Sequence, residues 1–264
     1  MKKTFWAIAL LLLTQNLYSI EPLLFKPLTA NTFEPRMGAI FSLNHDNLRL
    51  DIGGSIDLST LYKSDNSEIR LGGDFFTYTR LRSEGRFKFP VETSDYFFGI
   101  NASGKTQLLE NRFDWRVRLS HISSHLVDGY SKNGIFNKPP FVYSREFIDA
   151  VGATYYKDVR FYAGLTYIFS TLPKNISKVN PQFGFDSEQK FYKNLYASYG
   201  ADFNISSIKR KYELNSSAQI GVVFKSTMKT GIGLYYYIYN GWSIHGMFYD
   251  EKLSNSGIGF QLIF

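Results

Sequence analysis

The sequence predicts an all-β fold, a twelve-stranded antiparallel transmembrane β-barrel of the outer-membrane type. Three observations indicate it: an export signal at the start, long runs in which apolar and polar residues alternate, and an aromatic residue that ends the last run. A period of two is typical of a strand with one apolar and one polar face. An even number of strands of about 10 residues is what a bacterial outer-membrane barrel requires.

The composition excludes several other classes of protein. The chain has 264 residues, of which 44% are hydrophobic and 17% aromatic, with no cysteine and a formal net charge of +7. This apolar content excludes a disordered chain. The lack of cysteine excludes a disulfide scaffold and a thiolate metal site. The apolar run 5–13 is shorter than the roughly 20 residues that a membrane-spanning helix needs, so a helical membrane protein is not predicted.

The first residues have the pattern of a secretory signal peptide. Lys2 and Lys3 precede the apolar run, and a polar stretch ends at Ser19. A buried N-terminal helix is the alternative, which is disfavoured because nothing amphipathic follows. We therefore expect a signal peptide over 1–19 and a single barrel domain over 20–264, with a short periplasmic lead-in over 20–34.

The alternating runs define the expected strands. From Leu48 to Leu58, for example, the even positions are apolar or glycine, whereas the odd positions include Arg49 and Asp51. The helical spacing of three and four residues is not sustained anywhere, which argues against helices. Twelve strands are expected, over 35–43, 48–61, 67–81, 95–106, 111–124, 143–156, 159–170, 180–188, 193–204, 213–224, 230–238 and 255–264.

The direction of the apolar faces separates a soluble barrel from a membrane barrel. In a soluble barrel these faces point inward, whereas in a membrane barrel they contact lipid. The export signal and the many aromatic residues at strand ends favour the membrane barrel. We therefore expect an integral outer-membrane protein in which Ile52, Leu165 and Phe203 point outward.

The closing run 257–264 resembles the C-terminal signal that the barrel-assembly machinery reads. Gly259, Leu262 and Phe264 occupy the glycine, hydrophobic and terminal aromatic positions of that signal. The resemblance implies that the assembly machinery is a partner of this chain.

Connection lengths predict the orientation, because such barrels have short periplasmic turns and longer outer loops. With the N-terminus inside, Trp242–Tyr249 belongs to the last outer loop rather than to a strand. Turns are expected at 63–66, 108–110, 156–158 and 225–229, and outer loops at 83–93, 125–142, 171–179, 206–211 and 239–254.

The fifth expected strand carries a group with catalytic potential. Its alternation places His121 and Ser123 on the lipid side, where polar residues are costly away from the headgroups. Histidine is the usual base for a serine nucleophile. Glu146 starts the next strand and can orient the imidazole as the third member of a triad. The alternative interpretation is a polar patch at the level of the headgroups.

At these residues the chain resembles an uncharacterised family of bacterial outer-membrane β-barrels that carries no assigned activity. The resemblance rests on Phe25-Lys-Pro-Leu28, on the strand with Ser94-Asp-Tyr96, and on Arg118 with His121-Ile-Ser-Ser-His-Leu126. It also rests on Tyr143-Ser-Arg-Glu146, Arg160-Phe-Tyr162 and the final stretch Tyr237 to Tyr249.

The architecture is also similar to that of outer membrane phospholipase A, whose His-x-Ser pair lies on the outer surface of one strand with an Asn on the next. Here His121-Ile-Ser123 matches that pair. Aligning Ser144-Arg145 puts Ile148 at the position of the orienting Asn, and Ser124 replaces another expected Asn. The resemblance implies a serine-type lipid acyl hydrolase, and calcium is expected only under this phospholipase-like alternative. No other cofactor is expected.

Charged residues on the polar faces predict an ion-paired network inside the barrel, because buried charges need partners. Its expected members are Asp114, Arg116, Arg118, Arg145 and Asp149. The network either fills the lumen or, as a ring, selects ions.

Basic residues in the expected outer loops form a solvated face or contact the phosphates of lipopolysaccharide, so outer-membrane lipids are expected partners. Nucleic acid is not an expected partner. No metal site is expected, since His45 and His245 lie in separate outer loops with no acidic ligand pattern beside them. His125, at the start of a loop, is interpreted as a surface or lipopolysaccharide contact rather than a metal ligand. The basic residues of the expected outer loops, which form the solvated or lipopolysaccharide-binding face, are Lys132, Lys138, Lys174, Lys178, Lys209, Arg210 and Lys211.

Three functions follow from the sequence. The first is a structural or interaction role at the cell surface, with no assigned activity. The second is a lipid acyl hydrolase that acts on the outer leaflet through Ser123, His121 and Glu146. The third is a narrow channel lined by Arg116, Arg118 and their acidic neighbours.

Overall fold

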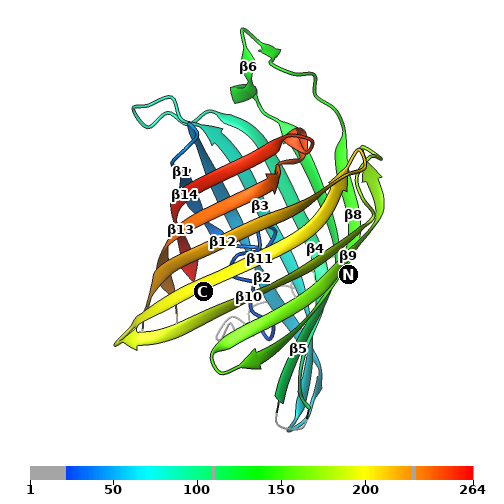
Figure 1. Cartoon of the computed structure of the whole chain (residues 1–264), viewed down its shortest axis with the longest axis vertical. Helices are drawn as coiled ribbons and strands as arrows, with labels where there is room; N and C mark the ends of the chain where they lie inside the picture. The colour runs from blue at the N-terminus through cyan, green and yellow to red at the C-terminus, as the bar shows by residue number, and fades with distance from the viewer. Residues whose placement is uncertain (1–21, 109–110, 227–229, 264) are drawn as a thin grey trace, which may run out of the picture.

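The computed structural model describes residues 22–108, 111–226 and 230–263; the predicted signal peptide and Phe264 lie outside them. Twelve antiparallel strands close into a barrel (Figure 1), as the sequence predicted. Within the described ranges, no helix is long and apolar enough to span a membrane. The barrel strands are β1 (Met37–Ser42), β2 (Asn47–Lys63), β3 (Ser67–Arg82), β4 (Val91–Leu108), β5 (Asn111–Leu126), β8 (Tyr143–Tyr156), β9 (Val159–Leu172), β10 (Val179–Tyr192), β11 (Leu195–Ile208), β12 (Lys211–Lys225), β13 (Gly231–Trp242) and β14 (Lys252–Ile263).

The apolar faces point outward, which confirms the predicted membrane type of barrel. Ile52 and Leu165 are each 48% exposed on the outer surface, and Phe203 is half-buried there. Their polar neighbours Asp51 and Asp202 are buried in the interior. The alternation that predicted the strands therefore also sets which face contacts lipid.

Pairing of β1 with β14 closes the barrel. In this pair Ala39 lies opposite Phe260 and Ile40 lies opposite Gly259. A Cβ atom at Gly259 would overlap the carbonyl oxygen of Ala39, so only glycine permits this close approach. Leu262, another residue of the predicted assembly signal, lies opposite Met37.

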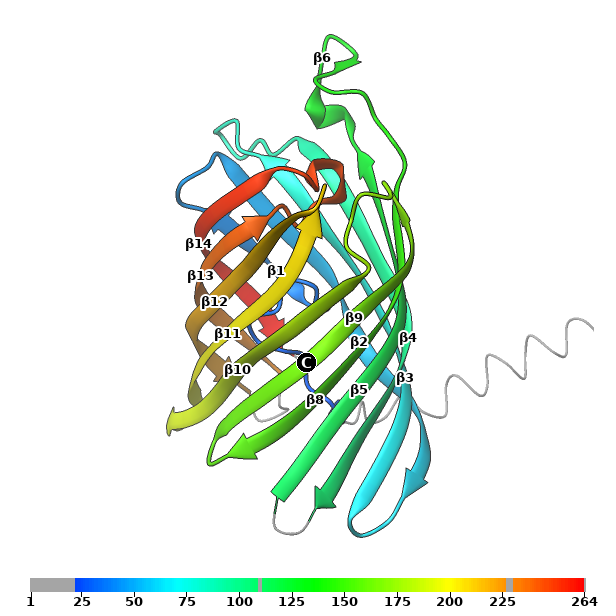
Figure 2. The same ribbon diagram turned by 45° about the vertical axis from the view of Figure 1, so that its right-hand side comes forward.

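The connections differ at the two ends of the barrel. The turns at 64–66, 157–158 and 193–194 lie at one end, here called the turn end, and the segments 83–90, 127–142 and 243–251 lie at the other, here called the loop end (Figure 2). The second of these segments contains a 3-10 helix (Asp128–Tyr130) and a hairpin of β6 (Ser131–Lys132) and β7 (Ile135–Phe136).

One predicted loop is a tight turn in the structure. Connection lengths predicted a loop over 206–211, but β11 continues to Ile208 and β12 begins at Lys211. Lys209 and Arg210 alone make the connection, with φ angles of 51° and 64°. A two-residue turn with positive φ at both residues matches the twist of the strands that it joins, which allows both strands to extend into the expected loop.

The connection from β13 to β14, residues 243–251, is here called the mouth loop. It contains a 3-10 helix (Gly246–Phe248) and lies outside the strands, as the sequence predicted for 243–249. The predicted loop over 239–254 is too long, because β13 continues to Trp242 and β14 begins at Lys252. It folds into the mouth of the barrel, where Met247 and Phe248 are buried against inward side chains such as Phe97 and Ile122. An apolar core therefore fills the lumen near the loop end.

Residues 22–36, here called the lumenal segment, lie inside the barrel. The sequence predicted a periplasmic lead-in over 20–34, but Phe25 and Leu28 are buried against inward side chains of β8 and β9. Backbone groups of the segment bond to the barrel wall at Asp57 of β2, Arg160 of β9, Asp186 of β10 and Ser217 of β12. The polar inner wall offers these partners, and the segment crosses the interior of the barrel (Figure 2).

Candidate functional site

Four polar side chains, His121 and Ser123 of β5 with Ser144 and Glu146 of β8, form what is here called the outer-face cluster. The strand register places His121 opposite Glu146 and Ser123 opposite Ser144. Alternation puts all four on the outer surface, because the intervening Ile122 is buried in the interior. The cluster lies toward the loop end of both strands.

Glu146 holds the imidazole of His121. Its Oε1 atom lies 2.9 Å from His121 Nδ1 and accepts a hydrogen bond of 2.5 Å from the Ser144 hydroxyl. A carboxylate accepts from a protonated ring nitrogen, so this contact assigns the proton to Nδ1. Nε2 then keeps its lone pair and is available as a base. The ring is also held by Phe98, whose centroid is 4.8 Å away.

Ser123 lies on the same strand face as His121, two residues further along β5. Within the described ranges, no hydrogen bond joins the Ser123 hydroxyl to the imidazole. Ser144 was not among the predicted members of this site. It could have been predicted from its position two residues before Glu146, because residues two apart share a strand face.

The structure also shows which residue of β8 faces the imidazole. The alignment to the phospholipase pattern put Ile148 at the orienting position, but Ile148 lies opposite Leu119. Glu146 occupies the position opposite His121 instead. The predicted triad members His121 and Glu146 therefore come together through the strand register.

Apart from Ser170 of β9, which lies opposite Glu146, the outer-face cluster is surrounded by rings and aliphatic side chains. Tyr96, Phe98 and Ile148 are exposed around it. His125, which the sequence analysis excluded as a metal ligand, has its ring 6.0 Å from that of Tyr96. Lipid chains rather than water-soluble molecules contact such a surface in an outer-membrane barrel.

The predicted lumen network is present, and it includes one further residue, Glu34, that was not predicted. Glu34 of the lumenal segment binds the Arg116 guanidinium through both carboxylate oxygens, one of them at 2.9 Å, and lies 3.6 Å from Arg118. Arg118 in turn pairs with Asp149 at 2.8 Å. These four side chains are buried, so each charge has a partner in the interior.

Two predicted members of the network lie apart from this group. Asp114 pairs with Arg112 at 2.8 and 2.6 Å and accepts a hydrogen bond of 2.7 Å from Tyr155. Arg145 packs between the rings of Phe33 and Tyr143, each 5.5 Å from its guanidinium carbon. Arg145 makes no ion pair with an acidic residue in the described part of the chain.

The other histidines are used in structural contacts. His45 bonds the Ser254 carbonyl oxygen at 2.8 Å, and His245 of the mouth loop bonds Asp95 at 2.7 Å. Among the described residues, no three His, Cys, Asp or Glu side chains are placed to hold a metal ion.

Comparison with solved structures shows the fold. The chain is similar to outer membrane phospholipase A from Escherichia coli, with 12% identity, a TM-score of 0.57, and coverage of 89% of this chain and 94% of that one. It is equally similar to the dimeric, calcium-bound outer membrane phospholipase of Salmonella typhi, with 12% identity, a TM-score of 0.57, and coverage of 90% and 93%. At this identity the likeness shows an outer-membrane barrel fold and no activity.

No curated protein sequence matches the chain. Residues 64–264 match a family described as "Protein of unknown function (DUF1207)". This match spans β3 to β14 and includes the outer-face cluster. The chain, whose fold is that of an outer-membrane β-barrel, therefore belongs to the DUF1207 family, a family of unknown function.

Proposed function

We propose that this protein is integral to the bacterial outer membrane and hydrolyses lipid esters at the outer leaflet. One observation carries the proposal: on the lipid-facing surface, Glu146 holds His121 at 2.9 Å beside Ser123. A carboxylate and an imidazole are costly on such a surface unless they have a function. The fold shared with outer membrane phospholipases supports the same reaction class.

The reaction follows from the roles of the three side chains. The Ser123 hydroxyl attacks the ester carbonyl carbon while His121 Nε2 takes its proton. The tetrahedral intermediate then expels the alcohol of the lipid, which receives that proton from the imidazolium, and leaves an acyl group on Ser123. Water, deprotonated by His121, then attacks the acyl carbon; the bond to Ser123 Oγ breaks, the imidazolium returns the proton to Oγ, and the fatty acid is released. Glu146 keeps Nδ1 protonated and stabilises the imidazolium.

Lipid is the substrate because of where the cluster lies. The longer connections at the loop end support its assignment as the extracellular end, which brings the cluster to the level of the outer leaflet. Its substrates there are the acyl esters of phospholipid or of lipopolysaccharide. The loop lysines and arginines are then positioned to contact lipid phosphates.

The channel hypothesis gains no support from the lumen. The lumenal segment and the Glu34–Arg116 ion pair occupy the space where an ion-selecting ring would need water. A structural role remains the outcome if the hydrolase test fails.

The test is fatty acid release from mixed micelles of phospholipid, measured with and without Ca²⁺. We expect Ser123→Ala and His121→Ala to lower the rate by about 10³-fold or more, since a serine mechanism loses its nucleophile or base. Glu146→Gln keeps the shape of the side chain and tests orientation. The faster migration of an unheated barrel on a denaturing gel checks that each variant is folded.

Ser144→Ala is the matched control. It removes the other hydroxyl of the cluster but leaves the contact between Glu146 and His121, so we expect most of the activity to remain. Equal or absent release from the wild type and Ser123→Ala removes the hydrolase. Loss of activity in Ser144→Ala alone contradicts the assignment of Ser123 as nucleophile.

A further inference from the structure

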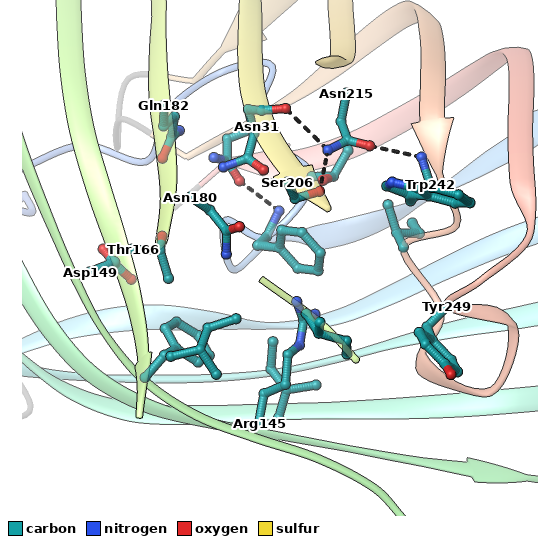
Figure 3. Close-up of a pocket in the computed structure, with 18 of the residues that line it drawn as sticks. Asn31, Arg145, Asp149, Thr166, Asn180, Gln182, Ser206, Asn215, Trp242 and Tyr249 are labelled. Carbon is teal, nitrogen blue, oxygen red and sulfur yellow. Dashed lines mark hydrogen bonds between the residues drawn. The ribbon is translucent and has the colours of Figure 1, made fainter. Parts of the chain in front are cut away.

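A cavity of about 110 Å³ lies in the lumen, enclosed by the lumenal segment, the mouth loop and the inner wall of the barrel. It is separate from the outer-face cluster, because its wall consists of inward-facing side chains. Phe33 of the lumenal segment and Tyr249 of the mouth loop lie on its border, and amides such as Asn180 and Asn215 line it (Figure 3).

The cavity has hydrogen-bond donors without acceptors. Arg145 Nε, Arg118 Nη1 and Trp242 Nε1 are buried and have no hydrogen-bond partner among the described residues. Trp242 is only 8% exposed. Asn180 accepts a hydrogen bond from Ser177 through its carbonyl oxygen, which leaves its amide hydrogens as further donors. Buried donors of this kind need an acceptor.

The two carboxylates of the cavity wall already accept hydrogen bonds. Asp149 pairs with Arg118 at 2.8 Å, and Asp202 accepts hydrogen bonds of 2.6 Å from Gln182 and 2.9 Å from Tyr162. No unpaired buried acceptor lines the cavity within the described ranges. What the cavity lacks is therefore an acceptor-rich group.

Arg145 supplies the charge for such a group. Its side chain extends from β8 toward the middle of the cavity (Figure 3), and the flanking Phe33 and Tyr143 rings hold the guanidinium in place. A guanidinium binds carboxylate or phosphate oxygens through paired hydrogen bonds. The partner of this group is therefore an anion.

We propose that this cavity binds a small oxyanion, a phosphate or a short carboxylate, with Arg145 as the main ligand. Arg118 Nη1, the indole N–H of Trp242 and the amide of Asn180 supply further hydrogen bonds. The volume sets the size, since a cavity of about 150 Å³ holds a molecule of six heavy atoms. The proposal concerns the lumen and does not depend on hydrolysis at the outer face.

The experiment uses the full-length protein folded in detergent and reads binding from the fluorescence of Trp242 and from calorimetry. The probes are inorganic phosphate, acetate and formate, with glycerol as an uncharged comparison at equal concentration. We expect saturable binding of phosphate or of a carboxylate, and the stronger of the two identifies the class of oxyanion. Glycerol is expected not to bind.

Arg145→Gln is expected to weaken anion binding by about tenfold or more, the loss of one charge-assisted contact. Arg145→Lys keeps the charge but not the paired geometry, so we expect an intermediate affinity. Arg86→Gln is the matched control, because it removes the same charge from an exposed loop and is expected to leave affinity unchanged.

Gel mobility without heating checks that the variants are folded. If Arg145→Gln does not fold, the affinity of Arg145→Lys is compared with that of the wild type instead. Absence of binding by all three anions at millimolar concentration overturns the proposal and leaves water as the occupant. Equal affinity in the wild type and the Arg145 variants also overturns it.

Discussion

Glu34 and Arg116 are 82 residues apart in the sequence, and their side chains form a buried, doubly hydrogen-bonded ion pair in the lumen. Glu34 belongs to the segment that precedes the first strand, whereas Arg116 lies in the middle of β5. The pair thus fixes the lumenal segment to the barrel wall. Arg118 contacts the same carboxylate, so Glu34 serves two buried cations.

Glu34→Gln is expected to destabilise the folded barrel by about 3–5 kcal/mol, because it leaves a buried guanidinium without its counter-charge. Urea unfolding in lipid vesicles measures the change. Glu251→Gln is the control, since it breaks an exposed pair with Lys138 that is worth about 0–1 kcal/mol. Similar small losses in both variants would contradict a stabilising role of the Glu34 contact.

Removal of residues 22–34 from a variant whose mouth loop is shortened to a turn is expected to open the lumen to ions. The lumenal segment bonds to four strands and fills the space between them, and the core around Met247 and Phe248 fills the loop end, so the loss of both leaves a water-filled path beside Arg116 and Arg118. Planar-bilayer recording measures the conductance of the wild type and of the deletion. A Gly–Ser segment of equal length in place of 22–34 tests whether specific packing is required. Identical conductance in all three would show that the segment does not obstruct the barrel.

The strands could be predicted because alternation is a local signal that is repeated along the whole chain. The lumenal segment could not, since residues 22–36 lack a period and their partners lie on strands distant in sequence. The position of Glu146 opposite His121 depends on the register between β5 and β8, which a long connecting loop leaves open. In contrast, the pairing of Arg112 with Asp114 could have been predicted, because the two residues are two positions apart and share one strand face.

Asp95→Ala is expected to loosen the mouth loop. The carboxylate of Asp95 binds His245 Nδ1 and the backbone N–H of Gly246, each at 2.7 Å, in a buried position. Its loss leaves two buried groups unpaired, at a cost of about 1–3 kcal/mol. Hydrogen exchange of the amides in 243–251 should accelerate accordingly. Asp128→Ala, in an exposed loop, should leave this exchange unchanged, and equal protection in the Asp95 variant would refute the tether.

Leu165→Arg is expected to destabilise the barrel by about 2–4 kcal/mol, since it places a charge on the lipid face near the middle of β9. Leu172→Arg makes the same exchange at the end of that strand, where the expected cost is about 0–1 kcal/mol. Unfolding in vesicles compares the two. A cost that is larger at the strand end would contradict the position of the membrane on this surface.

The titration of Asp250 in the mouth loop tests a contact across the loop end. A hydrogen bond of 2.8 Å from Lys209 lowers the pKa of Asp250 below its ordinary value near 3.8. A carboxyl with a lowered pKa stabilises the folded state above its unfolded pKa, and this contribution is lost as the pH falls through the folded pKa. The pair therefore supports the mouth loop at neutral pH, and this support is lost as the pH falls through the lowered pKa of Asp250.

Lys209→Gln should return the pKa of Asp250 toward its ordinary value, as measured by the carboxyl carbon shift in a ¹³C NMR titration. Lys174→Gln removes a nearby exposed charge that makes no ion pair with Asp250, so the pKa of Asp250 should stay low. The hydrogen bond, rather than the general positive charge of the loop end, then accounts for the shift. An Asp250 pKa that rises equally in both variants would assign the shift to that general charge instead.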